Sequence, residues 1–123
     1  MEHRTAEESR AAQIAYHLVP VPAWEARGSG ESYLPEAYEQ DGFIHTTNGL
    51  DPLIEVANMF YAGDDRTYMV LVLDTTKLVS ELRYDDDGQV YPHIYGPLNI
   101  DAVIATLAVD RADDGTFTGI RAA

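Results

Sequence analysis

The sequence contains no cysteine, and this absence narrows the chemistry open to the protein. Disulfides, thiolate nucleophiles and Cys-ligated zinc or iron–sulfur centres are all excluded. Basic residues are also few, because 8 Lys and Arg face 21 Asp and Glu, for a formal net charge of −13. Nucleic acids and anionic membrane surfaces are bound through clustered Lys and Arg, so we expect neither as a partner.

The N-terminus lacks the long apolar run of a signal peptide or a transmembrane segment, which favours a cytoplasmic protein. At 123 residues with 46% hydrophobic content, the chain is long enough to bury a core of its own. We predict a flexible leader or a loose helical turn over residues 1–12 and a single globular domain over residues 13–123. The sequence does not indicate an oligomeric state.

Hydrophobic patterning predicts more strands than helices. Residues 67–73 form a continuous apolar run of strand length, typical of a central strand buried on both faces. Between residues 50 and 61, apolar side chains recur at the i, i+3, i+4, i+7 spacing of a one-sided helix. Further strands are predicted at 14–19, 43–46, 79–84, 90–95 and 100–109, with an edge strand at 116–120, and short helices at 23–27 and 36–40.

Because strands and helices do not alternate regularly, the pattern favours an α+β fold over a doubly wound sheet. We expect a split, twisted mixed sheet of five to six strands with two to three helices at its side.

One stretch combines several groups that bind small molecules. An Asp41-Gly42 turn leads into a short apolar strand that carries His45, Thr46 and Thr47, and a helix follows directly. The imidazole donates or accepts hydrogen bonds, and the hydroxyls bind oxygen atoms. His17 and His93 occupy similar strand-like settings. Each histidine alone is most simply a packed strand residue, but ionisable groups collect at functional sites, and we predict that the three line one cleft with both threonines.

Aromatic residues flank the histidines. Trp24, Tyr91 and Tyr95 lie close to them in the sequence and could stack against a planar ring, although ordinary packing explains each one individually. The histidine spacing matches no metal-binding template, so we expect no metal. No serine stands in a Gly-x-Ser-x-Gly elbow.

Several motifs together resemble a family of small bacterial proteins, the domain-of-unknown-function family number 952. The similarity extends over about Ile14 to Val109, and its motifs are Tyr16-His17-Leu18-Val19, Trp24, Gly42-Phe43-Ile44-His45-Thr46-Thr47, Asn58-Met59-Phe60-Tyr61 and Pro92-His93-Ile94-Tyr95-Gly96-Pro97-Leu98.

This family has been related in fold to ADP-ribosyltransferases and RNA 2′-phosphotransferases. The resemblance implies that His17 holds the ribose and carboxamide end of a ligand and that His45 packs on the nicotinamide. His93 falls where many transferases carry a catalytic Glu, so its role as a substitute base is a hypothesis.

The leading hypothesis is therefore an enzyme-like domain that binds NAD, as a substrate, or a related nucleotide and acts at the ribose by transfer or hydrolysis. In it His45 and His93 are the catalytic candidates, and the ligand-binding candidates are His17, Thr46, Thr47, Trp24, Tyr91 and Tyr95. Two alternatives stay open: a non-catalytic module that binds a small molecule, and a metal-dependent hydrolase with histidine ligands.

Overall fold

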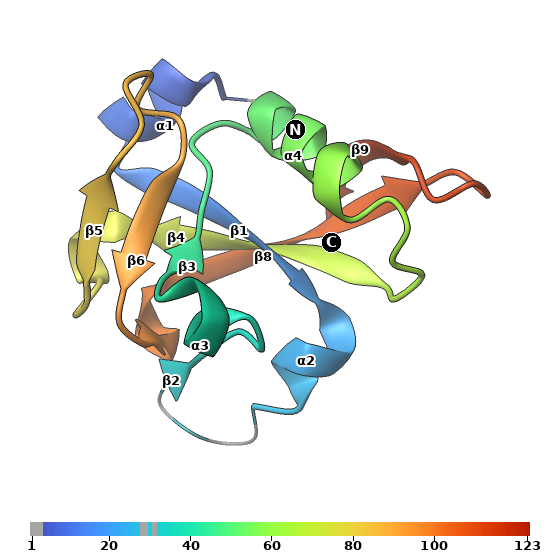
Figure 1. The fold of residues 1–123 in the computed structure, drawn as a ribbon. Coiled ribbons are helices and arrows are strands. Elements are labelled where there is room, and N and C mark those ends of the chain that lie inside the picture. Colours follow the sequence, from blue (N-terminus) through green and yellow to red (C-terminus); the bar gives the residue numbers. More distant parts are fainter. Residues whose placement is uncertain (1–3, 28–29, 31) are drawn as a thin grey trace.

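The computed structural model describes residues 4–27, 30 and 32–123, so the first three residues of the expected leader lie outside the described residues. The described residues form four helices and three antiparallel sheets, and the helices pack around the sheets (Figure 1). The helices are α1 (Ala6–Ala11), α2 (Val21–Glu25), α3 (Tyr38–Asp41) and α4 (Leu50–Phe60), with 3₁₀ turns η1 (Thr75–Lys77) and η2 (Ile100–Ala102). The strands are β1 (Ile14–Pro20), β2 (Ser32–Tyr33), β3 (Ile44–His45), β4 (Tyr68–Asp74), β5 (Glu81–Tyr84), β6 (Pro92–Tyr95), β7 (Leu98–Asn99), β8 (Val103–Arg111) and β9 (Phe117–Ala122).

The largest sheet has the strand order β1-β4-β8-β9, and β4 lies inside it. Alternate side chains of β4 point to opposite faces, as the pleat of a strand requires. Val70 and Val72 pack with helix α4, whereas Leu71 and Leu73 pack with the second, three-stranded sheet. The prediction of a central strand buried on both faces is therefore confirmed.

The second sheet has the order β3-β6-β5. Ile44 pairs with Ile94 and His45 with His93 across β3 and β6. A single bridge ties this sheet to β1, because Tyr16 and Thr47 exchange backbone hydrogen bonds of 2.9 Å in both directions. The segment around His45 is thereby held between the two sheets (Figure 1).

The α+β class and the helix over residues 50–61 are confirmed, but the expected mixed sheet is wrong. Every strand pair in the described part of the chain is antiparallel. Two two-residue strands, β2 and β7, were not predicted. Residues 100–102 form a 3₁₀ turn instead of the start of a strand, because the Asn99 side chain fixes the chain there through bonds to Val79 N, at 3.0 Å, and Lys77 O, at 2.9 Å.

Helix α1 occupies the segment expected to be a leader or a loose turn. Thr5 and Glu8 form a capping box that satisfies free N–H groups at the helix start. Ser9 is fully buried, and the buried amide of Asn48 donates to Ser9 Oγ, at 3.1 Å, and to Ile14 O, at 2.8 Å. Tyr84 donates to the Asn48 oxygen, at 2.6 Å. Asn48 therefore joins α1, β1 and β5 through one buried hydrogen-bond network.

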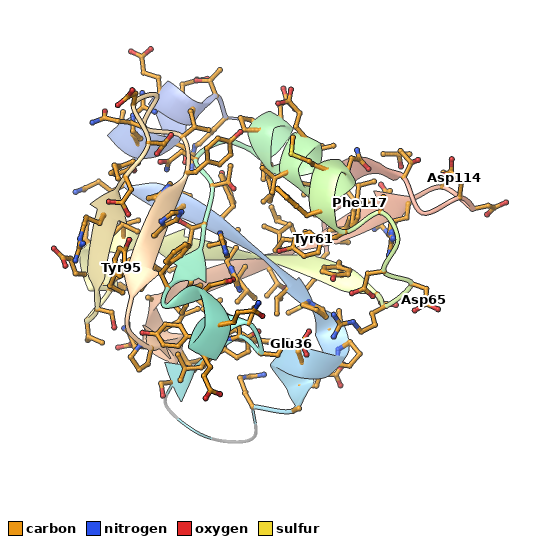
Figure 2. All side chains as sticks on the ribbon, in the orientation of Figure 1. Glu36, Tyr61, Asp65, Tyr95, Asp114 and Phe117 are labelled. Atoms are coloured by element: carbon orange, nitrogen blue, oxygen red, sulfur yellow. The ribbon has the colours of Figure 1, made fainter. Side chains whose placement is uncertain are left out.

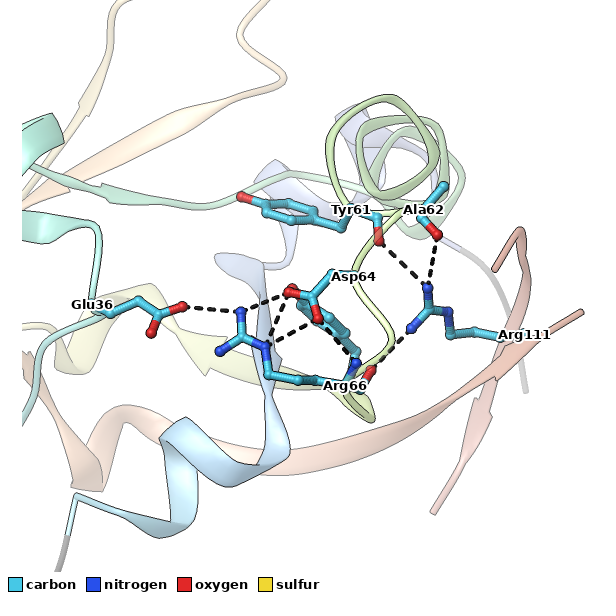
Figure 3. A network of polar contacts seen from close by, with 7 residues as sticks. Glu36, Tyr61, Ala62, Asp64, Arg66 and Arg111 are labelled. Atoms are coloured by element: carbon cyan, nitrogen blue, oxygen red, sulfur yellow. Dashed lines mark hydrogen bonds and ion pairs between the residues drawn. The ribbon is translucent and has the colours of Figure 1, made fainter. Parts of the chain in front are cut away.

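The loop between α4 and β4 is held by Arg111 of β8. Its guanidinium donates to the carbonyl oxygens of Arg66 (2.9 Å), Ala62 (3.2 Å) and Tyr61 (3.4 Å), as Figure 3 shows. The same group lies 4.3 Å over the ring of Phe117 in β9. A fork of five donors suits such a cluster of carbonyl groups, so Arg111 fixes the course of this loop.

Within the described residues, no helix is long and apolar enough to span a membrane.

Candidate functional site

A pocket of about 450 Å³ opens where β1, the segment from β2 to β3, helix α4 and the loop after it meet. This volume falls in the range of small-molecule sites. Most of the lining is apolar or aromatic, with a few polar groups. The lining residues are His17, Leu18, Pro20, Ala23, Tyr33, Pro35, Glu36, Ala37, Tyr38, Asp41, Phe43, His45, Thr47, Leu53, Val56, Phe60, Tyr61, Arg66 and Tyr68.

His17 is the buried histidine of this pocket. The residue is only 6% exposed, and Nδ1 lies 2.7 Å from the carbonyl oxygen of His45. Because a carbonyl only accepts, Nδ1 carries the hydrogen. Burial lowers the pKa of His17 to about 4, against the opposing effect of that backbone bond, so the ring is neutral at pH 7. Nε2 is then an acceptor, and it has no partner among the described residues.

His45 lies at the rim of the pocket, with its side chain 55% exposed. Its Nε2 lies 3.0 Å from the Asp41 carboxylate, four residues earlier. Gly42 makes this return possible, because its left-handed conformation (φ 80°) ends α3 and turns the chain into β3. In the neutral ring, Asp41 holds the hydrogen on Nε2 and leaves the Nδ1 lone pair free to take a proton.

The two threonines after His45 have different surroundings. Thr47 lines the pocket, and its backbone forms the bridge to Tyr16 of β1. Thr46 does not line it, because its buried hydroxyl donates to the carbonyl of Pro92, at 2.6 Å. Alternation along the extended chain after β3 sends the two side chains to opposite sides, so Thr47, and not Thr46, faces the pocket.

His93 does not line the pocket with the other two histidines. Its ring stacks on Phe43, with centroids 3.8 Å apart, and Phe43 itself is part of the pocket wall. Nδ1 is buried 3.3 Å from the Asp85 carboxylate without completing a hydrogen bond. The predicted convergence of three histidines is wrong in this respect: His93 supports a wall from behind.

The predicted aromatic ligand wall is also displaced. Trp24 is buried in the core, with its ring edge toward Tyr33 at 5.2 Å, and Tyr33 is the residue that lines the pocket. The Tyr95 hydroxyl donates to Asp85, and Figure 2 shows Tyr95 by β5 and β6, apart from Glu36 and Tyr61. Tyr91 lies next to β6 and also outside the lining. These three residues were chosen by closeness in sequence to histidines, which does not determine the face on which a side chain lies.

Sequence reasoning missed an ion-pair cluster at the pocket mouth. Arg66 binds both carboxylate oxygens of Asp64, with contacts of 2.6 to 3.1 Å, and also reaches Glu36 at 3.0 Å (Figure 3). Tyr68 donates to Asp64 at 2.7 Å. The Arg66 hydrogen bonds hold the pKa of Asp64 well below its usual range. Only the folded chain brings Glu36 to Arg66, because 29 intervening residues separate them in the sequence.

Two tyrosines of the lining are held in the neutral form by burial. Burial raises the pKa of Tyr33 to about 12, and the charge of Glu36 adds to the shift. Burial likewise raises the pKa of Tyr61, with a smaller effect from Asp41. Within the described ranges, no group of three or more His, Asp and Glu side chains is arranged to hold a metal ion.

Comparison with known proteins gives a family and a fold. A family model described as "Protein of unknown function (DUF952)" matches residues 18–106. The crystal structure of protein CC0527 from Caulobacter crescentus is 23% identical, with a TM-score of 0.72, and the match covers 85% of this chain and 93% of that one.

A double mutant of CC0527 matches at 22% identity with the same TM-score and coverage, and its solution NMR structure at 22% identity with a TM-score of 0.64, covering 84% and 90% of the two chains. At these identities the likeness shows the fold alone. Among curated proteins, none matches this chain.

Proposed function

The chain belongs to the family of proteins of unknown function DUF952, and from this premise we propose that its pocket binds NAD or a related nucleotide and acts at the ribose. The relationship to ADP-ribosyltransferases, and NAD as the substrate, are parts of this proposal. The observation that carries it is one pocket that combines a buried acceptor on His17 with the His45–Asp41 pair at its rim.

Each group has a distinct task in this proposal. His17 Nε2 accepts a hydrogen bond from the carboxamide or from a ribose hydroxyl and so orients the ligand. The ribose–nicotinamide C–N bond breaks, and nicotinamide leaves as a neutral molecule with the bonding electron pair. The attacking water or acceptor hydroxyl bonds to the ribose carbon and loses its proton to His45 Nδ1, while Asp41 holds the ring and stabilises the positive charge that develops on it. The carboxylates of Asp41 and Glu36 favour an oxocarbenium-like centre at the ribose carbon.

His93, proposed from the sequence as a catalytic base, has no step in this mechanism. Its contact with Phe43 gives it a positioning role in the pocket wall. Thr46, Trp24, Tyr91 and Tyr95 likewise support the surrounding structure, whereas Thr47 remains a ligand-binding candidate.

Calorimetric titration with NAD and ADP-ribose, followed by chromatography of the incubated nucleotide, tests the proposal. We expect saturable binding and slow release of nicotinamide, with turnover lost in His45→Ala and strongly reduced in Asp41→Asn. Glu39→Gln is the matched control, because Glu39 lies on the same helix, is exposed and is not part of the lining. Absence of binding at millimolar nucleotide by folded wild-type protein would remove the proposal.

A non-catalytic binding module is the second candidate, and a specific observation favours it. Both carboxylates in the described lining are already engaged, Asp41 with His45 and Glu36 with Arg66. Neither is therefore free to activate a ribose hydroxyl in the resting structure. This candidate predicts the same binding isotherm with no nicotinamide released over days.

A further inference from the structure

Aromatic rings dominate the described lining of the pocket. Six residues contribute them besides the histidines: Tyr33, Tyr38, Phe43, Phe60, Tyr61 and Tyr68. They come from four separate parts of the chain, namely β2, the segment from α3 to β3, the end of α4 with the loop after it, and β4. The faces of such rings carry partial negative charge, and several rings around one space form the kind of cage that binds organic cations.

The formal charge at the pocket is negative, like the partial charge on the ring faces. Glu36 and Asp41 line it, and Asp64 lies directly behind Arg66. Arg66 is the one guanidinium of the described lining, and its Nε and Nη2 atoms bind Asp64 and Glu36. Arg27 lies outside the lining, 3.9 Å over the ring of Trp24. Three carboxylates against one engaged guanidinium leave a net negative site on a protein whose charge is already −13.

The buried imidazole of the described lining favours a hydrogen-bond donor over an anion. As a neutral ring, His17 offers an acceptor, not a positive donor. An anionic carboxylate or phosphate next to that lone pair would be repelled, whereas a cation or an N–H donor would be attracted.

We infer that the pocket selects ligands that carry an organic cation, such as a quaternary ammonium or a pyridinium ring, over neutral and anionic molecules of the same shape. This deepens the proposed function, since the nicotinamide ring of NAD is a pyridinium, but it depends on the rings and carboxylates and not on ribose chemistry.

The test uses a pair of molecules that differ in charge alone. Choline is titrated at pH 8 beside its carbon analogue, the neutral alcohol in which a quaternary carbon replaces the nitrogen. We expect choline to bind at least about tenfold more tightly, because a desolvated cation over several rings gains substantially over its neutral isostere. The preference should shrink as salt is raised, through screening of the carboxylates.

Variants assign the preference to this site. Asp41→Asn and Glu36→Gln are solvent-accessible changes that keep side-chain shape, and each should weaken choline binding several-fold without changing binding of the alcohol. Phe60→Leu, at a side chain 69% exposed and therefore safe for folding, should do the same by removing one ring. Glu39→Gln should leave both ligands unchanged.

The outcomes separate the two proposals. Choline and the alcohol binding equally, or neither binding, would overturn the inference whatever NAD does. Selective choline binding without any affinity for NAD or ADP-ribose would keep the inference and remove the proposed function.

Discussion

Acidification should destabilise the protein through His17 specifically. The pKa of this buried ring is about 4 in the folded chain, against about 6.5 in the unfolded chain. The unfolded state therefore takes up a proton as the pH falls below about 6.5, and the folded state does so only near 4. Because the folded pKa is the lower one, the contribution of the neutral ring to stability is full above about pH 6.5 and is lost as the pH falls toward 4.

The size of the effect follows from the gap between the two pKa values. At pH 5, about 1.5 units below the pKa of the unfolded ring, the unfolded state is protonated while the folded ring is still neutral. The free energy of unfolding is therefore lower by about 2 kcal/mol, at roughly 1.4 kcal/mol per pH unit. With a urea dependence of about 1–3 kcal/mol per molar for a domain of this size, the unfolding midpoint should fall by roughly 1 M between pH 7 and pH 5. His17→Phe should remove that part of the slope.

Urea unfolding of wild type, His17→Phe and His45→Gln at both pH values is the measurement. The exposed His45 serves as the control, because its variant leaves the buried His17 ring and its contribution to the pH dependence in place. If the unfolding midpoints of wild type and His17→Phe fell equally between pH 7 and pH 5, the reasoning would be refuted. An NMR titration in which the His17 ring gains its proton near pH 6.5 would refute it as well.

Three further predictions concern the supports of the fold. Asn48→Ala should lower the free energy of unfolding by about 2–4 kcal/mol, because it breaks a buried hydrogen-bond network. Tyr84→Phe removes a single donor of that network and should lower it by about 1–2 kcal/mol. Urea unfolding of both variants compares the two losses, and equal small losses would contradict the network. Gly115→Ala should destabilise the protein strongly, because φ of Gly115 is +96° and a Cβ there would collide with a carbonyl oxygen of the α4–β4 loop. Gly42→Ala, with φ +80° and open space around the position, should cost only about 1 kcal/mol. Thermal unfolding of both variants measures the difference. Asp64→Asn should make the loss of stability below about pH 4 less steep. The folded pKa of Asp64 is depressed, so its contribution to folding stability is present above the unfolded pKa and disappears as the carboxyl takes up a proton. An unchanged acid-unfolding curve would argue against the ion pair with Arg66.

Local pattern was sufficient for the elements that bury continuous or periodic apolar side chains. The run at Thr67–Leu73 and the one-sided pattern at Leu50–Tyr61 predicted β4 and α4, because burial on two faces or on one leaves a direct trace in composition. The two-residue strands β2 and β7 were missed because neither has a continuous or alternating apolar run of its own. The turn at residues 100–102 was hidden because a neighbouring side chain, Asn99, determines it.

The site was predictable in part. His17, His45 and Thr47 do come together, since strand pairing and the Tyr16–Thr47 bridge bring β1 and β3 side by side. His93 was predicted for the same cleft from its similar strand-like setting, and it does pair with His45, but its ring turns to Phe43. The ion pairs of Arg66 could not be foreseen, because they depend on two loops that meet only after folding.

The hydrogen bonds from Arg111 to the α4–β4 loop determine where the chain can be truncated without disturbing the pocket. The family match ends at residue 106, ahead of both that guanidinium and the strand on which it rests. A fragment that ends at residue 106 would keep His17 and His45 but would lose the guanidinium that fixes Tyr61 and Arg66. Truncation at residue 106 should therefore give a molecule that keeps the pocket histidines but whose α4–β4 loop, one side of the binding pocket, is no longer fixed.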